Sequence, residues 1–101
     1  MYVLTCADGS LYTGATTNLE RRLAAHRQGK ASRYTRSRLP VALLAWWHPG
    51  SYNLARSHEA RFKMLSRRQK LEVLCGDEAF GCPLRRAPDE HATASRRASK
   101  I

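Results

Sequence analysis

The first fourteen residues constrain the fold of this chain more than any other segment. Residues 2–6 and 11–13 are rich in β-branched and aromatic side chains, and the strong turn signal Asp8-Gly9 separates them. This pattern predicts a β-hairpin. Two strands joined by so short a turn run antiparallel, because a parallel pair needs a crossover of about a dozen residues or more.

The hairpin turn is compatible with two registers, which differ in where they put two tyrosines. A two-residue loop places Tyr2 and Tyr12 on opposite faces of the hairpin. A three-residue loop, with Gly9 in the left-handed conformation, pairs Cys6 with Ser10. Tyr2 is then the diagonal neighbour of Tyr12 on the same face, about 7–8 Å away. Composition leaves both registers open.

Three helices and one more strand are expected after the hairpin. Capping-box spacing predicts helices over residues 17–27 and 66–75, and apolar residues at helical spacing predict another over residues 53–65. The apolar run at residues 41–48 is too short for a typical helix, so we interpret it as a buried strand. The basic segment at residues 29–40 is expected to be a loop.

The resulting element order is β-β-α-β-α-α. It predicts an α/β domain with a small, three-stranded, mainly antiparallel sheet flanked by three helices. After Gly76 the periodicity disappears, and Gly, Pro, Ala, Ser and scattered charges dominate. We therefore expect one domain over residues 1–76 and a flexible polar tail over residues 77–101.

Charge narrows the class of partner. The chain has 18 Lys and Arg residues against 8 Asp and Glu, a net charge of +10. Residues 1–75 hold 13 of the basic side chains and four of the acidic ones, so the surplus lies in the part expected to fold. A strongly basic soluble domain most often binds nucleic acid.

Other classes of protein are excluded by what the sequence contains. Its apolar runs fall short of the roughly 18 residues of a membrane span, and the first residues lack the profile of a signal peptide. The three cysteines, Cys6, Cys75 and Cys82, are too scattered for a disulfide framework or a zinc pair. We expect a cytoplasmic protein that does not act at a membrane.

A series of short motifs carries a resemblance to a known family. The motifs are Tyr2, Tyr12-Thr13-Gly14, the capped Asn18-Leu19-Glu20-Arg21-Arg22-Leu23, Gly29-Lys30 with Tyr34-Thr35-Arg36, and Glu59 with Lys63-x-Leu65-Ser66. In this order they resemble the GIY-YIG nuclease superfamily and are similar to its small standalone bacterial members. The resemblance covers about residues 2–75. Two departures are that only Met1 precedes Tyr2, in place of Gly-Ile, and that Thr13 replaces an isoleucine.

The resemblance implies an endonuclease that hydrolyses DNA phosphodiester bonds with one Mg²⁺ or Mn²⁺ ion. Because no recognition module is appended to so small a domain, we also expect it to select DNA structure, such as a nick, flap or branch, in repair or recombination. The catalytic residues that the resemblance implies are Tyr2, Tyr12, Arg22, His26 and Glu59, with Glu59 as the metal ligand.

These residue types suit that chemistry. One carboxylate can hold a hard divalent cation that keeps most of its waters, and a guanidinium fork can bind the scissile phosphate. A positioned side chain can orient or deprotonate the attacking water. Either Tyr2 or Tyr12 is the expected base, with His26 in support.

The basic segment after the first helix is the candidate nucleic-acid interface. Its predicted contacts are Lys30, Arg33, Tyr34, Arg36 and Arg38, joined by Lys63 from the helix expected over residues 53–65 and extended by Arg67, Arg68 and Lys70. We expect contacts to the backbone that do not depend on base sequence. DNA is the expected partner and RNA the alternative. Neutralising about five phosphates would give a slope of log affinity against log salt of about −4.5.

The same residues also allow a purely structural interpretation. Tyr2 and Tyr12 can pack across the strands, and Glu59 can form an ion pair with Lys63 one helical turn later. The alternative function is therefore a non-catalytic basic module that keeps the fold and binds DNA or RNA.

Overall fold

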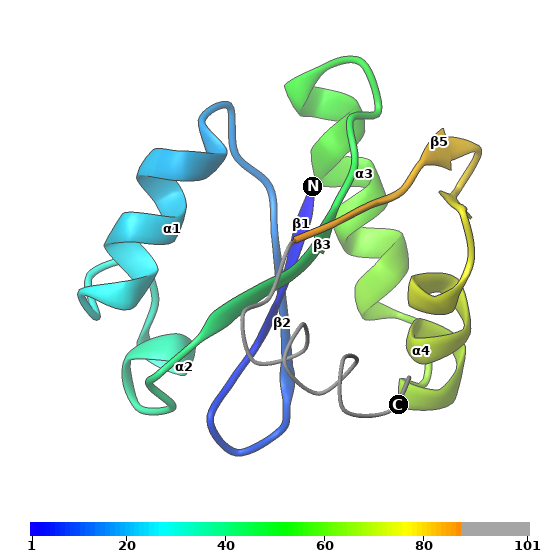
Figure 1. The fold of residues 1–101 in the computed structure, drawn as a ribbon. Helices are drawn as coiled ribbons and strands as arrows, with labels where there is room; N and C mark the ends of the chain where they lie inside the picture. Colours follow the sequence, from blue (N-terminus) through cyan, green and yellow to red (C-terminus); the bar gives the residue numbers. More distant parts are fainter. Residues whose placement is uncertain (88–101) are drawn as a thin grey trace, which may run out of the picture.

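The computed structural model describes residues 1–87 and contains a four-stranded antiparallel sheet (Figure 1). Its strands are β1 (Tyr2–Thr5), β2 (Leu11–Gly14), β3 (Ala42–Trp46) and β6 (Arg85–Arg86). Their order across the sheet is β2-β1-β3-β6, and each neighbouring pair runs antiparallel. A second, two-stranded sheet joins β4 (Glu78–Ala79) to β5 (Cys82–Pro83).

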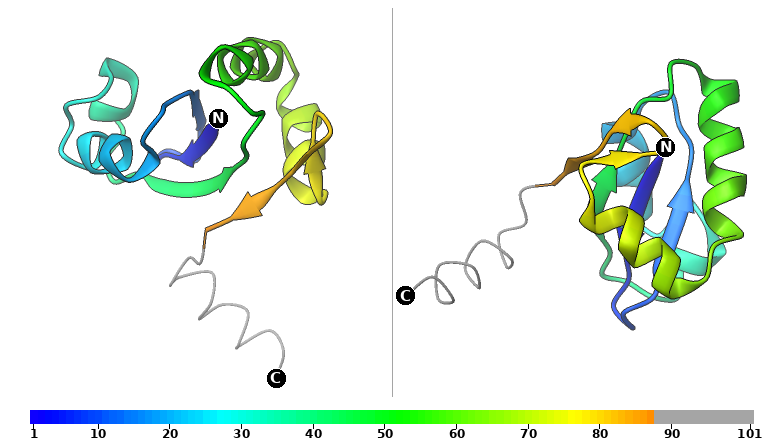
Figure 2. Two further views of the ribbon diagram at one scale, coloured as in Figure 1. Left: turned by 90° about the horizontal axis from the view of Figure 1, so that it is seen from above. Right: turned by 90° about the vertical axis from the view of Figure 1, so that its right-hand side faces the viewer.

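Helices cover both faces of the larger sheet (Figure 2). Helix α1 (Leu19–Arg27) and the one-turn helix α2 (Arg33–Arg36) lie on one side. Helices α3 (Tyr52–Lys63) and α4 (Arg67–Cys75) lie on the other. Within residues 1–87, no helix combines the length and the apolar character that crossing a membrane would require.

The hairpin has the three-residue loop. Thr5 pairs with Leu11, and the amide of Cys6 donates to the carbonyl oxygen of Ser10 at 2.9 Å. Gly9 has a φ of 83°, a left-handed conformation that costs glycine little. This register places Leu4 opposite Tyr12, so the two tyrosines lie on one face of the hairpin.

The alternation of strand residues divides the core between the two faces of the sheet. On the α1 side the buried cluster is Tyr2, Leu4, Cys6, Leu23 and Val41. On the α3 and α4 side it is Met1, Val3, Ala45, Trp47, Ala55, Phe62, Leu74 and Ala79. Trp46 and Trp47 pack on opposite faces, as expected for neighbours in a strand. The β1–β3 register shifts between Val3 and Leu4, which leaves Leu44 as an extra residue on β3.

The structure confirms the α/β class and the mainly antiparallel sheet, with two additions. Residues 33–36, expected to lie in a loop, form α2, because the Ser32 side chain accepts the amide of Thr35 and caps a helical turn. The sheet has four strands, since β6 adds to β3 through Ala45↔Arg86 and Trp46↔Arg85.

The segment after Gly76 also differs from the expected polar tail. The Arg86 guanidinium donates to the carbonyl oxygens of Leu74 and Gly76, at 2.7 and 2.6 Å, and so satisfies the end of α4. Leu84 packs against the core beside it. Short strands therefore occur within residues 78–86, where the sequence shows no periodic pattern, while residues 88–101 lie outside the described part. The division into a domain and a tail stays a prediction.

Candidate active site

Because Tyr2 pairs with Gly14 across the hairpin, the Tyr2 hydroxyl lies against the backbone of residue 14. Tyr2 is only 2% exposed, and a Cβ atom at residue 14 would lie 2.5 Å from its hydroxyl oxygen. Glycine is therefore needed at this position to make room for the phenol. The same oxygen lies 2.8 Å from Nε2 of His26, near the end of α1.

His26 also contacts α2 through its second ring nitrogen. The histidine is fully buried, and its Nδ1 lies 2.9 Å from Oγ1 of Thr35, which is also fully buried. Thr35 is fixed in turn by the cap of α2, where its amide donates to Oγ of Ser32. A single hydrogen-bonded chain thus joins β1, α1 and α2.

Tyr12 lies beside this chain, on the face that the hairpin register predicts. Its ring meets the imidazole of His26 edge to face, with ring centroids 5.1 Å apart. The Tyr2 ring contacts the same imidazole at 5.7 Å. Tyr12 is half-buried, and within residues 1–87 its hydroxyl makes no hydrogen bond. The Tyr2 hydroxyl is therefore committed to His26, whereas that of Tyr12 is free for a ligand.

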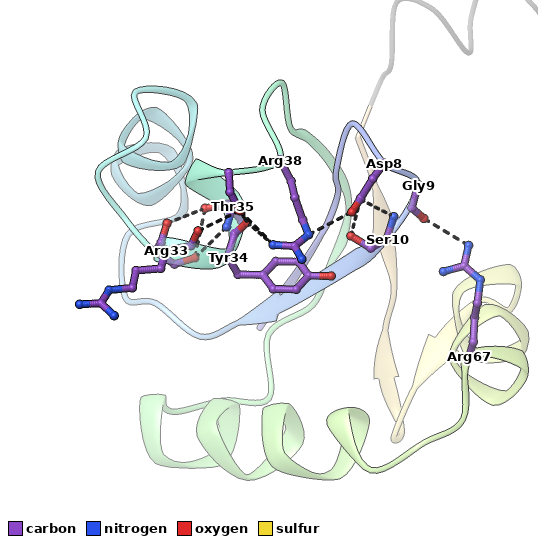
Figure 3. Close-up of polar contacts among 10 residues, drawn as sticks. Asp8, Gly9, Ser10, Arg33, Tyr34, Thr35, Arg38 and Arg67 are labelled. Atoms are coloured by element: carbon purple, nitrogen blue, oxygen red, sulfur yellow. Dashed lines mark hydrogen bonds and ion pairs between the residues drawn. The ribbon is translucent and has the colours of Figure 1, made fainter.

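A column of contacts connects Tyr12 to the turn of the hairpin, and Figure 3 shows the part of it from Tyr34 through Arg38 to Asp8. The ring of Tyr34 stacks on Tyr12, with centroids 5.9 Å apart, and the Arg38 guanidinium lies 3.8 Å from the centroid of Tyr34. Arg38 Nε also donates to Oδ2 of Asp8 at 3.0 Å. On the other side of the turn, Arg67 donates to the carbonyl oxygen of Gly9. These contacts hold the hairpin turn against α2 and α4.

Two charged residues act on the Tyr2 phenol from different helices. The pKa of Tyr2 is raised, mainly because the phenol is buried and then because Tyr12 lies nearby. The Arg22 guanidinium opposes this rise in the pKa, and the Glu59 carboxylate adds to it. Three of the other predicted catalytic side chains, Tyr12, Arg22 and Glu59, thus affect the pKa of one phenol, which stays protonated at neutral pH.

The same arrangement keeps His26 neutral. Its pKa is lowered, first by burial and then by the positive charge of Arg22. Arg22 itself is exposed, and it lines a hollow of about 320 Å³ with Thr16, Thr17, Asn18, Arg21 and Ala25. A guanidinium in an open hollow is free to bind an anionic ligand.

Glu59 is half-buried on α3, with 22% of its side chain exposed. Its Oε2 accepts from Nζ of Lys63 at 2.8 Å, the i,i+4 ion pair that its spacing allows. Within residues 1–87 no three His, Cys, Asp or Glu side chains group into a metal centre. One carboxylate fits Mg²⁺, which keeps several waters, better than a metal that needs a full protein cage.

The predicted nucleic-acid contacts fall into two groups. Lys30, Arg33 and Arg36 line one hollow of about 420 Å³ together with Gly29, Ala31 and Ser32. The other three are held by the protein itself: Tyr34 by Tyr12, Arg38 by Asp8, and Lys63 by Glu59. Only the first group is therefore arranged as a free cationic surface.

Two residues near the site had no role predicted from the sequence. Thr35 was noted only as part of the motif Tyr34-Thr35-Arg36, and the local signal for its place in a helix was Ser32 three residues before it, the spacing of a helix cap. Tyr52, at the start of α3, raises the pKa of Tyr2 slightly. Sequence spacing carries no signal for that proximity, because it depends on how α3 packs beside β2.

The chain resembles known proteins over most of its described length. The family model for the GIY-YIG catalytic domain matches residues 1–72. A UPF0213 protein of Streptococcus sanguinis (strain SK36) is 54% identical over 74 residues, which cover 73% of this chain and 85% of that protein. A UPF0213 protein of Streptococcus pyogenes serotype M5 (strain Manfredo) is 56% identical over 75 residues, 73% of this chain and 82% of the relative.

A third relative agrees with these two. A UPF0213 protein of Lactococcus lactis subsp. cremoris (strain SK11) is 53% identical over 74 residues, 72% of this chain and 76% of that protein. No solved structure matches the chain. The match to the family spans the hairpin, helices α1 to α3 and most of α4, and so includes every residue of the candidate site.

Proposed function

The chain belongs to the GIY-YIG catalytic domain family, and on that premise we propose that it is a metal-dependent endonuclease that hydrolyses DNA phosphodiester bonds. The family as a whole implies nuclease activity. The proposal adds the substrate, the metal requirement and the residues. The observation that carries it is the contact of two hairpin tyrosines with one buried histidine, within electrostatic reach of Arg22 and Glu59.

Tyr12, Tyr2 and His26 each take one part in activating a water molecule. The free hydroxyl of Tyr12 orients the water. The water gives a proton to the Tyr2 oxygen while the Tyr2 hydroxyl proton passes to Nε2 of His26, 2.8 Å away. The hydroxide formed bonds to phosphorus as the bond to the leaving sugar oxygen breaks, and solvent protonates that oxygen. This route needs no phenolate, which suits a tyrosine whose pKa is raised.

Arg22 and Glu59 stabilise the negative charge of the phosphate, the first directly and the second through a metal ion. The exposed Arg22 guanidinium donates hydrogen bonds to the non-bridging oxygens, where charge builds up during the reaction. Glu59 would hold one Mg²⁺ or Mn²⁺ ion, which when bound acts as a Lewis acid toward the phosphate.

The free cations near α2 support binding to the DNA phosphate backbone without regard to base sequence. Lys30, Arg33 and Arg36 line an open hollow and offer charge to phosphates, which carry no base sequence. We therefore include in the proposal that the substrate is a DNA structure, such as a nick, flap or branch, met in repair or recombination.

Substitution of Glu59 tests the proposal. Wild-type protein should cut nicked, branched or supercoiled DNA in Mg²⁺ or Mn²⁺, and Glu59→Gln should abolish cutting while DNA affinity stays within a few fold. Glu72→Gln, an exposed carboxylate on α4, is the matched control and should cut like wild type. Failure of the wild type to cut any of these DNAs with either metal would contradict the proposal.

One observation favours the alternative function. Because Lys63 already pairs with the Glu59 carboxylate at 2.8 Å, the pair can be purely structural. In that case the chain is a basic module that binds DNA or RNA without cutting. Salt-dependent binding without cleavage, on DNA and RNA of matched shape, is the result that this alternative predicts.

A further inference from the structure

The buried threonine on α2 has a role that the family resemblance did not assign. We propose that Thr35 is a positioning residue: its hydroxyl accepts the Nδ1 proton of His26 and so keeps the Nε2 lone pair directed at the Tyr2 hydroxyl. This inference rests on the proposed function, because it concerns the same proton path.

The hydrogen bonds around Thr35 determine which way its hydroxyl points. Its Oγ1 lies 3.4 Å from the carbonyl oxygen of Ser32, a group that can only accept. Donation to that carbonyl leaves two lone pairs on Oγ1. Oγ of Ser32, at 3.2 Å, and Nδ1 of His26, at 2.9 Å, can then both donate to it. The hydroxyls of Ser32 and Thr35 both have partners in this arrangement.

The opposite arrangement leaves a buried proton without an acceptor. If Thr35 donated to Nδ1, a neutral His26 would carry its proton on Nε2 and donate it to Tyr2. The hydroxyl proton of Tyr2 would then need another acceptor, and within residues 1–87 its one hydrogen bond is the one to His26. Burying an unsatisfied donor is costly, and Tyr2 is 2% exposed. The Nδ1–H tautomer of His26 is therefore favoured.

The groups around His26 keep its imidazole neutral. The titratable and charged groups that face it are Arg22 on α1, Tyr12 on β2, and Glu59 and Tyr52 on α3. Among them only Arg22 affects the pKa of His26, which burial and this charge together lower. A neutral imidazole with one free nitrogen is what the proton path requires.

Nitrogen-15 NMR of the histidine side chains in the full-length chain tests the inference without reference to activity. The wild type should show His26 protonated on Nδ1 and not on Nε2, with the signal assigned by its loss in His26→Asn. Thr35→Val removes the acceptor at constant shape and should shift His26 toward Nε2–H. Thr35→Ser restores the hydroxyl and should look like wild type. A wild-type His26 protonated on Nε2 would overturn the inference, even if Thr35→Val does not fold.

Single-turnover cleavage provides the second readout. Thr35→Val should lower the rate of cleavage about 100-fold at unchanged DNA affinity, because the acceptor nitrogen for Tyr2 is lost. Thr35→Ser should restore the rate. Ser37→Ala, which removes an exposed hydroxyl bonded only within α2 and to Arg38, is the matched control. Wild-type cutting with an unaffected Thr35→Val would overturn this inference alone, whereas a wild type that does not cut would contradict the proposed function.

Discussion

The two faces of the sheet bury different kinds of side chain. On the α1 and α2 side, Tyr2, His26 and Thr35 form a hydrogen-bonded chain that is almost wholly buried. On the α3 and α4 side the interior is mainly apolar, with Phe62 against Trp47 at a ring distance of 5.9 Å.

The apolar face also contains one polar contact, which differs from the Tyr2–His26–Thr35 hydrogen bonds in what it joins. Trp47 Nε1 donates to Nδ1 of His58 at 3.0 Å, a contact that satisfies an indole inside the core. The Tyr2 chain instead joins three elements at the hairpin, where Gly14 makes room for the hydroxyl. We infer that the apolar face mainly supplies stability, although α3 also carries Glu59, and that the other face accepts the cost of burying polar groups in order to hold Tyr2 and His26.

The largest expected effect is on stability, and it belongs to the apolar face. Phe62→Ala deletes a fully buried ring and should lower the free energy of unfolding by about 3–5 kcal/mol, from lost burial and the cavity left behind. Urea denaturation measures this loss. At a temperature where the variant is folded, its cleavage rate per folded molecule should match wild type. A large loss of cleavage rate in the folded variant would contradict the idea that this face contributes mainly stability.

A methyl group at residue 14 should act mainly on the polar face. Gly14→Ala forces the Tyr2 hydroxyl to move, since the new atom would lie 2.5 Å from it. We expect about 1–3 kcal/mol of destabilisation from overpacking and a loss of cleavage of about 100-fold from misplacement. Gly76→Ala is the matched control, because its Cβ would meet nothing closer than 3.5 Å. Equal cleavage by the two variants would contradict this account of Gly14.

The split among the predicted DNA contacts predicts a difference in salt dependence. Replacing Arg33 and Arg36 by Gln should reduce the slope of log affinity against log salt by about 1.8 on duplex DNA, because each releases about 0.9 of a counterion. Arg38→Gln should change the slope less, since Asp8 and Tyr34 already hold that guanidinium. Fluorescence anisotropy between about 50 and 200 mM salt, a range over which a slope of about −4.5 changes the affinity by about 500-fold, measures both. A larger change in slope for Arg38→Gln than for the double replacement would show that Arg38, and not Arg33 and Arg36, binds the phosphates.

The smallest expected effect is on the pH dependence of stability, and both faces contribute to it. Burial is the main cause of the lowered pKa of both His26 and His58. The unfolded chain therefore takes up protons first, so stability should be full above the usual histidine pKa of 6.5. It should fall as pH drops from there through the folded pKa values.

Urea denaturation in steps from pH 7.5 downward checks this dependence. His58→Phe should remove part of the slope below about pH 6.5. The pKa of Asp8 is also lowered, chiefly by its hydrogen bonds to Ser10, but its contribution is lost only below its ordinary value of 3.8. Stability that stays level between pH 7 and 4.5 would contradict the buried neutral state of both histidines.

Much of the fold could be predicted because its signals are local. The hairpin, the capped helices and the buried strand each show a pattern in a few adjacent residues. The register of the hairpin could not be chosen, because both loops satisfy the turn signal and only packing separates them. Strand β6 was missed because Arg85 and Arg86 carry no strand pattern, and their position depends on carbonyls at the end of α4.

The candidate site was predictable only where a motif marked it. Tyr2, Tyr12 and His26 are motif positions, and the structure brings them together. Thr35 stood in a motif but had no predicted role, because its importance comes from a hydrogen bond to a residue nine positions earlier. Arg38 was grouped with the free cations, since a sequence does not reveal that Asp8, thirty positions away, pairs with it.

The central claim is that the hairpin tyrosines and their histidine form the proton path of a nuclease. Its most direct test is cleavage of branched, nicked or supercoiled DNA by wild type, Tyr2→Phe and Tyr12→Phe in Mg²⁺ or Mn²⁺. We predict that wild type cuts and that each variant loses about 10²–10⁴ in rate while it still binds DNA. A wild type that leaves every DNA intact, or Phe variants that cut at its rate, would contradict the account.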